Sequence, residues 1–372
     1  MSHRNESISG RPNDLQETRC IKGHMEDGTA IYRHIYRCRN TEGQRTQPEA
    51  RIQHGKSSSE ARHAAPPESV EQYLNRWLQS IQFSVRKSTY ANYDRLIRRH
   101  IVPAIGKVPL FQVSNSMIQR YINQKLENGR LDGNGGLSVK TARDIVGLLK
   151  RSLKAVGIEL NISLPKYSLP KLRVLTHEEQ HALIAAAQTQ GNTDSLGVLI
   201  SLFTGIRIGE LCSLKWGDIS FQDGVLKISK TLQRIENCES DKKSKTVIEI
   251  GTPKNDGATR EIPLAPFLLY RLSQLKDAAH DDDYVLSGSC RYVEPRLCQY
   301  RFKRLVKSAG IDDINFNTLR HTFAARCVEL EMDAKTISDL LGYTNCSTIL
   351  DRYVHPSFEH QRVCLEKLSR YL

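Results

Sequence analysis

Apolar side chains recur at helical spacing through residues 66–165. Positions 70, 73, 74, 77, 78 and 81 are apolar, which is the spacing of one buried helix face and predicts a helix over residues 70–81. The same pattern predicts three more helices, at residues 89–101 behind the cap residue Ser88, at residues 116–128 and at residues 138–156. We expect Pro103 to stop the second of these, because proline lacks the amide proton that a helix interior needs. The segment is therefore predicted to be a helical domain.

Beyond a linker at residues 165–171, helical and strand patterns alternate as far as residue 372. Thr176 and Glu179 have the spacing of a capping box, so a helix is expected to begin at residue 177. Residues 225–229 are typical of a strand. Residues 246–250 and 259–264 flank Lys-Asn-Asp-Gly, which predicts a β-hairpin with Lys254 at its tip. The predicted fold class is mainly α with a small β-sheet: a helical domain followed by a mixed α/β domain over residues 171–372.

Residues 1–65 differ from the rest of the chain. They contain few large apolar residues and five of the twelve histidines. Residues 30–39 followed by Asn-Thr-Glu-Gly resemble one hairpin, and residues 53–67 are typical of a linker. We therefore predict a poorly defined N-terminal segment that ends in a linker.

Composition narrows the class of protein. The chain of 372 residues is 39% hydrophobic and 26% charged, which excludes a wholly disordered protein. Its longest apolar stretch, Leu196–Ile206, is shorter than the roughly 20 residues of a membrane-spanning helix, and residues 1–30 lack the apolar run of a signal peptide. Nine scattered cysteines without a Cys-x-x-Cys pair favour reduced thiols. We expect a soluble protein of the bacterial cytoplasm.

The formal net charge of +13 predicts a polyanionic partner, with nucleic acid before an anionic membrane surface. Most of the excess lies in residues 66–170, which carry 16 basic and 7 acidic side chains, whereas residues 171–372 carry 27 and 26. Basic residues of the predicted helices lie largely off the apolar faces, where they form either a phosphate-contacting surface or a merely solvated one. The candidates for DNA contact are Arg95, Arg98, Arg99, Lys140, Arg143, Lys150 and Arg151.

Two patterns contain potential zinc ligands, and neither predicts a metal site. Residues 177–181 match His-Glu-x-x-His, but His177 falls in the first turn of its helix, and no His or Glu follows before Glu210. Two Cys/His pairs, residues 20 with 24 and 34 with 38, have spacings that match no established zinc pattern. We expect no metal and no cofactor, and a zinc peptidase or a basic helical regulator is a minor alternative.

Several motifs lie between residues 203 and 353, and their order along the chain indicates the function more specifically than any single motif does. Thr-Gly-Ile-Arg-Ile-Gly-Glu-Leu, at residues 204–211, holds Arg207 and Glu210 on one helix face. Leu-Arg-His-Thr-Phe follows with Arg320, Leu-Leu-Gly-Tyr-Thr-Asn with Tyr343, and Arg-Tyr-Val-His-Pro with Tyr353.

In this order, and with the hairpin lysine, the motifs resemble the tyrosine recombinase (phage integrase) family over roughly residues 68–372, in the style of integrases from prophages and conjugative transposons. The resemblance implies a core-binding domain at residues 66–165 that clamps DNA and a catalytic domain at residues 171–372. It implies that residues 1–65 include a possible arm-site DNA-binding domain. The amphipathic segment 358–372 would dock on a neighbouring protomer or pack on its own domain.

The resemblance also implies a function and a set of partners. The protein would be a site-specific recombinase that integrates or excises a mobile element and acts as a homo-tetramer on two DNA duplexes. A directionality factor and a host DNA-bending protein would be further partners, and no membrane partner is expected. The alternative is a DNA-binding accessory protein with weakened or lost chemistry.

Roles for single residues follow from the same resemblance. Tyr353 would attack the scissile phosphate to give a 3′-phosphotyrosine and a free 5′-hydroxyl, without metal or ATP. Arg207 and Arg320 would bind the non-bridging oxygens of the pentacoordinate phosphorus with their guanidinium groups. Lys254 would protonate the leaving oxygen, and Glu210 would support the site.

Two positions depart from the family pattern. The residue three before the second arginine is usually His and is Asn317 here, and the residue after Leu-Leu-Gly is usually His or Trp and is Tyr343 here. Asparagine cannot transfer a proton near neutral pH, which supports the accessory-protein alternative, whereas tyrosine keeps a donor and competes as the nucleophile. His321 points about 100° round the helix from Arg320 and is not expected to replace the missing histidine.

Overall fold

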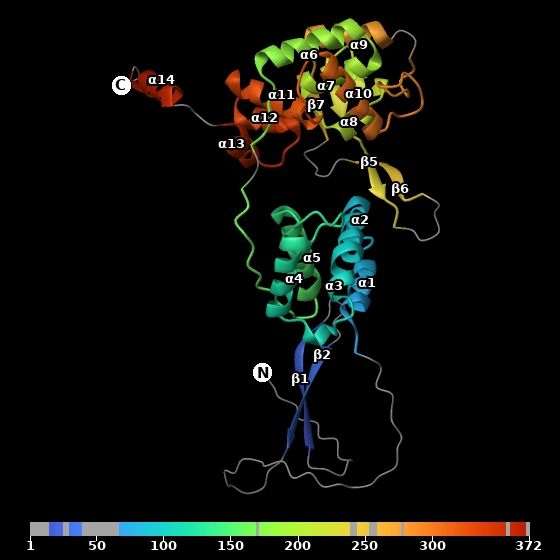
Figure 1. The fold of residues 1–372 in the computed structure, drawn as a ribbon, viewed down its shortest axis with the longest axis vertical. Coiled ribbons are helices and arrows are strands. Elements are labelled where there is room, and N and C mark those ends of the chain that lie inside the picture. Colours follow the sequence, from blue (N-terminus) through green and yellow to red (C-terminus); the bar gives the residue numbers. More distant parts are fainter. Residues whose placement is uncertain are drawn as a thin grey trace. The chain divides into compact units, whose positions relative to one another are not determined.

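The computed structural model describes residues 15–24, 30–38, 67–168, 171–238, 244–252, 259–276, 279–354 and 358–369. The chain divides into two compact units, Met1–Ala65 and Pro66–Leu372. The second unit is mostly helical with small sheets, which confirms the predicted fold class (Figure 1). Among the described residues, no helix is both long and apolar enough to cross a membrane.

In the first unit, β1 (Leu15–His24) and β2 (Ala30–Cys38) form an antiparallel pair. The register runs from Leu15 opposite Cys38 to His24 opposite Ala30, with a bulge near Gly23. The strand at residues 30–38 agrees with the predicted hairpin, but its partner precedes it in the chain instead of following it. Charged and polar residues interrupt the apolar alternation of β1, so the sequence pattern does not identify it as a strand.

In the second unit, five helices form a bundle with its own hydrophobic core (Figure 1). Its fully buried side chains include Leu74, Ile118 and Leu149, which lie on the apolar faces that the sequence predicts. Serine hydroxyls at positions 69, 114 and 138 cap three of the helices. The helices are α1 (Val70–Ser80), α2 (Lys87–Leu96), α3 (Val102–Ile105), α4 (Asn115–Asn128) and α5 (Val139–Lys154).

The second predicted helix begins and ends differently from the prediction. Ser88 is not its cap, because α2 already starts at Lys87. Pro103 does not stop the helix either, because α2 continues through a π-helical turn, Ile97–Ile101, into α3. In this turn the amide of Val102 bonds to the carbonyl five residues back. The wider turn lies where the proline ring and its missing amide proton would disrupt a regular helix.

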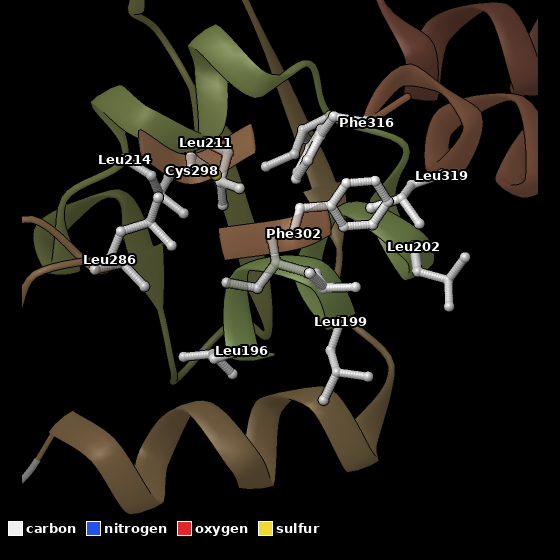
Figure 2. Packing of buried hydrophobic residues seen from close by; sticks show 14 of the residues in the cluster. Leu196, Leu199, Leu202, Leu211, Leu214, Leu286, Cys298, Phe302, Phe316 and Leu319 are labelled. Carbon is white, nitrogen blue, oxygen red and sulfur yellow. The ribbon is translucent and has the colours of Figure 1, made fainter. Parts of the chain in front are cut away.

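Helices α6 to α11 share a larger core around α7 (Thr193–Thr204), most of whose side chains are buried, whereas buried residues of α11, α12 and α13 form a separate small cluster. Figure 2 shows Leu196, Leu199 and Leu202 of α7 in this cluster together with Phe302 and Leu319. A helix that is apolar on all sides belongs in a core, which accounts for the longest apolar stretch of the sequence. The remaining helices are α6 (His177–Gln190), α8 (Ile208–Ser213), α9 (Pro266–Lys276), α10 (Pro295–Ser308), α11 (Asn317–Glu329), α12 (Ala334–Leu341), α13 (Ser347–Tyr353) and α14 (Phe358–Ser369).

Two small sheets accompany these helices. In the first, β4 lies between β3 and β7. In the second, β5 pairs with β6 as a ribbon (Figure 1). Both sheets are antiparallel. The strands are β3 (Ile219–Ser220), β4 (Val225–Ile228), β5 (Thr231–Glu236), β6 (Thr246–Gly251) and β7 (Arg260–Pro263).

The strand pairing shows that the predicted hairpin is wrong. The two runs that flank Lys254 are β6 and β7, and they belong to different sheets. Leu226 and Ile228 of β4 are buried together with Ile262 of β7, whereas β6 is only partly buried along its length. Burial of apolar side chains therefore decides the partner of β7, and the local turn signal does not.

Candidate active site

Arg207 and Glu210 are held together at the start of α8. Gly205 ends α7 with a positive φ of 65°, which turns the chain so that Arg207 directly precedes α8. The Glu210 carboxylate accepts hydrogen bonds from the Arg207 amide at 3.0 Å and from its Nη1 at 2.7 Å. Only 1% of the Glu210 side chain is exposed, against 39% of the Arg207 side chain. A buried carboxylate thus fixes an arginine whose outer part remains accessible.

Arg260, at the start of β7, is a second partner of this carboxylate that was not predicted from the sequence. Its Nη2 lies 3.0 Å from Glu210 Oε2, and its Nε donates to the Leu340 carbonyl at 2.6 Å. Burial alone would raise the pKa of Glu210, but Arg260 and Arg207 together hold that pKa below its ordinary value. The available signal was the period of two in β7, which places an arginine on the same buried face as Ile262.

Arg320, on α11, is the buried counterpart of Arg207. It is 2% exposed, and its Nη1 and Nη2 donate to the carbonyls of Gly205 and Leu341, each at 2.7 Å. Burial and the positive charge of Arg207 lower the pKa of Arg320. Because the charge of Arg207 acts on Arg320, the two guanidinium groups together favour the binding of an anion.

Tyr343 lies against both guanidinium groups. Gly342 ends α12 with a positive φ of 67°, and the ring of the next residue lies 4.7 Å from Cζ of Arg320 and 5.7 Å from Cζ of Arg207. A Cβ atom at position 342 would come within 2.9 Å of Arg260 Nη1. Backbone conformation and close approach therefore both require glycine before Tyr343.

Tyr353, the last residue of α13, joins the site through a histidine. Its hydroxyl lies 2.5 Å from Nδ1 of His321, and Nε2 of His321 lies 2.7 Å from Nδ2 of Asn317. His321, which was not expected to replace the missing histidine, is thus in contact with Tyr353. Residues 317 and 321 are about one turn apart on α11 and share a face, onto which α13 brings Tyr353, whereas Arg320 points into the protein.

The surroundings shift the pKa values of this pair in opposite directions. Burial and the neighbouring Tyr343 raise the pKa of Tyr353, although Arg320 and Arg352 act against them. Burial, Arg320 and Arg352 lower the pKa of His321 to about 4. A protonated phenol and a neutral imidazole therefore face each other at physiological pH.

The remaining predicted site residues are Lys254 and the basic candidates for DNA contact. Lys254 lies outside the described residues, in the segment between β6 and β7. The seven basic candidates for DNA contact lie on α2, on the π turn that follows it and on α5, and all but Arg95 are exposed. Some have carboxylate neighbours: Arg98 Nε donates to Asp94 at 2.6 Å, and Arg99 pairs with Glu236. Asp94 is itself buried, whereas the pair of Lys140 with Asp144 is exposed; an exposed pair contributes about 0.2–1 kcal/mol, so a phosphate can replace the carboxylate of such a pair at little cost.

The His-Glu-x-x-His sequence has a structural role at the start of α6. Thr176 and Glu179 form the predicted capping box, with hydrogen bonds of 3.2 and 2.8 Å between side chains and backbone amides. His177 Nε2 lies 3.4 Å from a carboxylate oxygen of Glu329, on α11. Within the described ranges, no group of three or more His, Cys, Asp or Glu side chains is arranged to hold a metal ion.

The site thus gathers two guanidinium groups, a phenol and a neutral imidazole from segments that are far apart in the sequence. Arginines fixed by a carboxylate and by backbone carbonyls are suited to bind phosphate oxygens without reorganisation. A phenol in contact with a base is an oxygen nucleophile. This arrangement fits the transfer of a phosphoryl group to a tyrosine hydroxyl.

Known proteins resemble most of the chain outside its N-terminal segment. The phage integrase family matches residues 173–360, just over half of the chain, and the phage integrase N-terminal SAM-like domain matches residues 69–126. A XerC-like tyrosine recombinase of Caldanaerobacter subterraneus subsp. tengcongensis is 22% identical over 327 residues, which cover 80% of this chain and 81% of that protein.

Two solved structures share the fold. The Tn1549 transposon integrase in complex with a circular intermediate DNA has a TM-score of 0.63 at 21% identity, over 81% of this chain and 99% of that chain. A lambda integrase tetramer bound to a Holliday junction has a TM-score of 0.55 at 20% identity, over 79% of this chain and 80% of that chain.

Proposed function

The chain belongs to the phage integrase family of tyrosine recombinases, and on this premise we propose that it cleaves and rejoins DNA at specific sites with Tyr353 as the nucleophile. The observation that carries the proposal is the convergence of Tyr353, Arg207 and Arg320 around one ring, that of Tyr343. In cleavage, Oη of Tyr353 bonds to phosphorus, and the bond from phosphorus to the 5′ oxygen breaks. The product is a 3′-phosphotyrosine that conserves the bond energy for rejoining.

The two arginines would stabilise the charge that develops on phosphorus. The carbonyls of Gly205 and Leu341 fix the plane of the Arg320 guanidinium, and Glu210 fixes Arg207 in the same manner. Donors that are already in place need no reorganisation during the reaction, which is the main source of electrostatic catalysis. Tyr343, whose ring covers both groups, would move or donate its hydroxyl to the phosphate when DNA binds.

Lys254 is our candidate for the acid that protonates the leaving 5′ oxygen. The support for this role is the family resemblance and the position of the lysine in the segment before β7, whose first residue, Arg260, contacts Glu210. A lysine ammonium near a phosphate can deliver a proton that the leaving alkoxide requires.

The DNA partner is inferred from charge and from the relatives. The bundle carries most of the basic excess of the chain, and its exposed arginines and lysines would contact DNA phosphates. The Tn1549 integrase and the lambda integrase, which share this fold, were solved on DNA, the latter as a tetramer. We infer a homo-tetramer on two attachment sites of a mobile element in a bacterial cytoplasm, with a directionality factor and a DNA-bending protein as further partners.

Helix α14 would contribute to that assembly. Leu365 and Leu368 are 66% and 57% exposed, so the apolar side of α14 lacks full cover within its own chain. Docking of α14 on a neighbouring protomer would bury both leucines. This exposure favours docking in trans over packing of the tail on its own domain.

A nicked suicide DNA substrate tests the proposed function. Cleavage releases a short fragment that diffuses away, so the covalent protein–DNA adduct accumulates and is visible on a denaturing gel. We expect an adduct with the wild type, none with Tyr353→Phe, and an adduct on Tyr353 with the matched control Tyr343→Phe. DNA binding without any adduct would instead favour the accessory-protein alternative.

A further inference from the structure

His321 joins Tyr353 to Asn317 in a chain of hydrogen bonds. The distances are 2.5 Å from Tyr353 Oη to His321 Nδ1 and 2.7 Å from His321 Nε2 to Asn317 Nδ2. The rings of His321 and Tyr353 also pack together, with centroids 5.9 Å apart. Tyr353 and His321 are partly buried and Asn317 is exposed, so the chain of contacts runs from the site toward solvent.

Attack on phosphorus requires Tyr353 to lose its proton, and its surroundings oppose that loss. Burial and Tyr343 raise the pKa of the phenol above its ordinary value of about 10. Such a nucleophile needs a base within hydrogen-bond reach. Asn317 cannot take up a proton near neutral pH, whereas the imidazole in contact with the hydroxyl can.

We propose that His321 is the catalytic base for Tyr353 and that Asn317 is the positioning residue that sets its tautomer, an inference that rests on the proposed recombinase function. The proton moves from Oη to Nδ1 while the bond between Oη and phosphorus forms and the bond to the 5′ oxygen breaks. The 5′ oxygen takes its proton from a separate acid, for which Lys254 is the candidate. In rejoining, the 5′-hydroxyl gives that proton back and attacks phosphorus, and His321 returns its proton to Tyr353.

Asn317 controls which nitrogen of the ring carries the proton. With Nδ2 toward the ring, the amide donates to Nε2, so Nδ1 carries the proton and donates to Tyr353. Rotation of the amide by about 180° keeps its volume and turns Oδ1 toward Nε2–H, which leaves the lone pair of Nδ1 for the phenol proton. The same oxygen then stabilises the imidazolium. A nucleophile, a base and an orienting group in line are the arrangement of covalent catalysis in unrelated enzymes.

The neighbouring arginines link the strength of this base to substrate binding. The charged and titratable groups around the ring are Arg320 on its own helix and Arg352 and Tyr353 on α13. Burial and the two arginines keep His321 neutral before DNA arrives, with a pKa of about 4. A phosphate bound at Arg320 offsets part of the charge of this arginine and therefore raises the pKa of His321 above about 4. The base therefore becomes stronger when the substrate is in place.

The first test is single-turnover cleavage of the nicked substrate by full-length His321→Gln at a series of pH values. Glutamine keeps hydrogen-bonding groups for both neighbours but cannot take up a proton. We expect the rate to fall by about 10²–10⁴-fold, with unchanged DNA affinity and thermal stability. In the wild type the rate should fall in acid with a midpoint between about 4 and 6.5, and this dependence should disappear in the variant. A wild-type rate and pH profile in His321→Gln would overturn the proposal.

Two substitutions of Asn317 test the tautomer. Aspartate accepts from Nε2–H in either orientation and adds a negative charge, so Asn317→Asp should keep or raise the rate and move the acid limb to higher pH. Asn317→Ala removes the orienting group and should lower the rate at least tenfold, without loss of DNA binding. If Asn317→Ala keeps both the rate and the pH profile, Asn317 has no positioning role.

A sulfur-substituted substrate separates the base from the acid. When sulfur replaces the bridging 5′ oxygen, the leaving group needs no proton, so the defect of Lys254→Ala should disappear and that of His321→Gln should persist. Rescue of His321→Gln by sulfur would place His321 at the leaving group and overturn the proposal. An adduct that survives Tyr353→Phe would count against the proposed function itself, so the two failures are distinguishable.

Discussion

The helical bundle and the catalytic domain use their positive charges in opposite ways. In the bundle, Arg98 and Lys140 lie on helix surfaces and face carboxylates one turn away. In the catalytic domain, Arg320 and Arg260 are buried and bonded to backbone carbonyls. Residues 66–170 carry 16 basic against 7 acidic side chains, whereas residues 171–372 carry 27 against 26. A count of charges therefore predicts a candidate surface for a polyanion, whereas burial and carbonyl bonds distinguish the cations of the candidate active site.

Removal of the shared carboxylate should have the largest effect on stability. Glu210→Ala removes the carboxylate that pairs with the buried guanidinium of Arg260 and releases Arg207. Loss of one partner of a buried ion pair costs about 3–5 kcal/mol, which urea denaturation would measure. Glu210→Gln, which keeps the volume and one acceptor, is the control and should lose less. A loss below about 1 kcal/mol for Glu210→Ala would show that buried and exposed charges are not as different as we argue.

Arg320→Lys should have the next largest effect. Lysine keeps the charge but cannot bond to the carbonyls of Gly205 and Leu341 at once, and an unpaired buried carbonyl costs about 1–3 kcal/mol. Adduct formation on the nicked substrate should also be lost. Arg98→Lys is the matched control in the bundle, because its side chain is 67% exposed and the change should stay within about 0.5 kcal/mol. Equal melting temperatures for the two variants would contradict the claimed difference between the buried Arg320 and the exposed Arg98.

Acid should weaken the catalytic domain through the same carboxylate. The pKa of Glu210 is held below its ordinary value in the folded protein, so the group contributes stability above that ordinary value of about 4.3. The contribution is lost as the pH falls below 4.3 and through the lowered pKa. The free energy of unfolding should therefore fall more steeply with acid in the wild type than in Glu210→Gln. Parallel curves for the two proteins would show that another group controls this range.

The sequence predicts local features of both regions well. Helices α1, α4 and α5 follow from apolar spacing, which depends on neighbours within one turn, although the cap expected at Ser88 is wrong. The pairing of β7 with β4 and the π turn before Pro103 were not predicted, because each depends on burial or on a neighbouring turn that no local signal encodes. The order of motifs identifies the family, and the match to residues 173–360 confirms it.

In the candidate site, too, contacts between distant parts of the chain are not predicted from local sequence patterns. The motifs predict Arg207, Arg320 and Tyr353, and the structure brings them together. The roles of His321 and Arg260 depend on contacts across 32 and 50 residues, so periodicity alone does not reveal them. The angle between His321 and Arg320 on the helix predicts no role for His321, whereas the contact with Tyr353 depends on how α13 packs against α11.

The smallest effect on stability should accompany a large effect on DNA binding. Replacement of Arg95, Arg98 and Arg99 by alanine removes side chains whose pairs with Asn92, Asp94 and Glu236 are exposed or partly buried. Each such loss should stay below that of Glu210→Ala, and the largest should be at Arg98, whose partner Asp94 is buried. Each phosphate contact that disappears should reduce the slope of log affinity against log salt by about 0.9, or by about 2.7 for all three.

Salt titration of the triple variant decides whether the basic bundle is a DNA surface or only a solvated one. Lys303→Ala is the control, because Lys303 belongs to the catalytic domain and is equally exposed, in a pair with Asp313 at 3.0 Å. If the bundle contacts DNA, the slope falls in the triple variant and stays constant in the control. If both slopes equal that of the wild type, the excess charge of the bundle is not used on DNA. The count of charges would then fail to predict a DNA-binding surface, and only the site that burial distinguishes would remain.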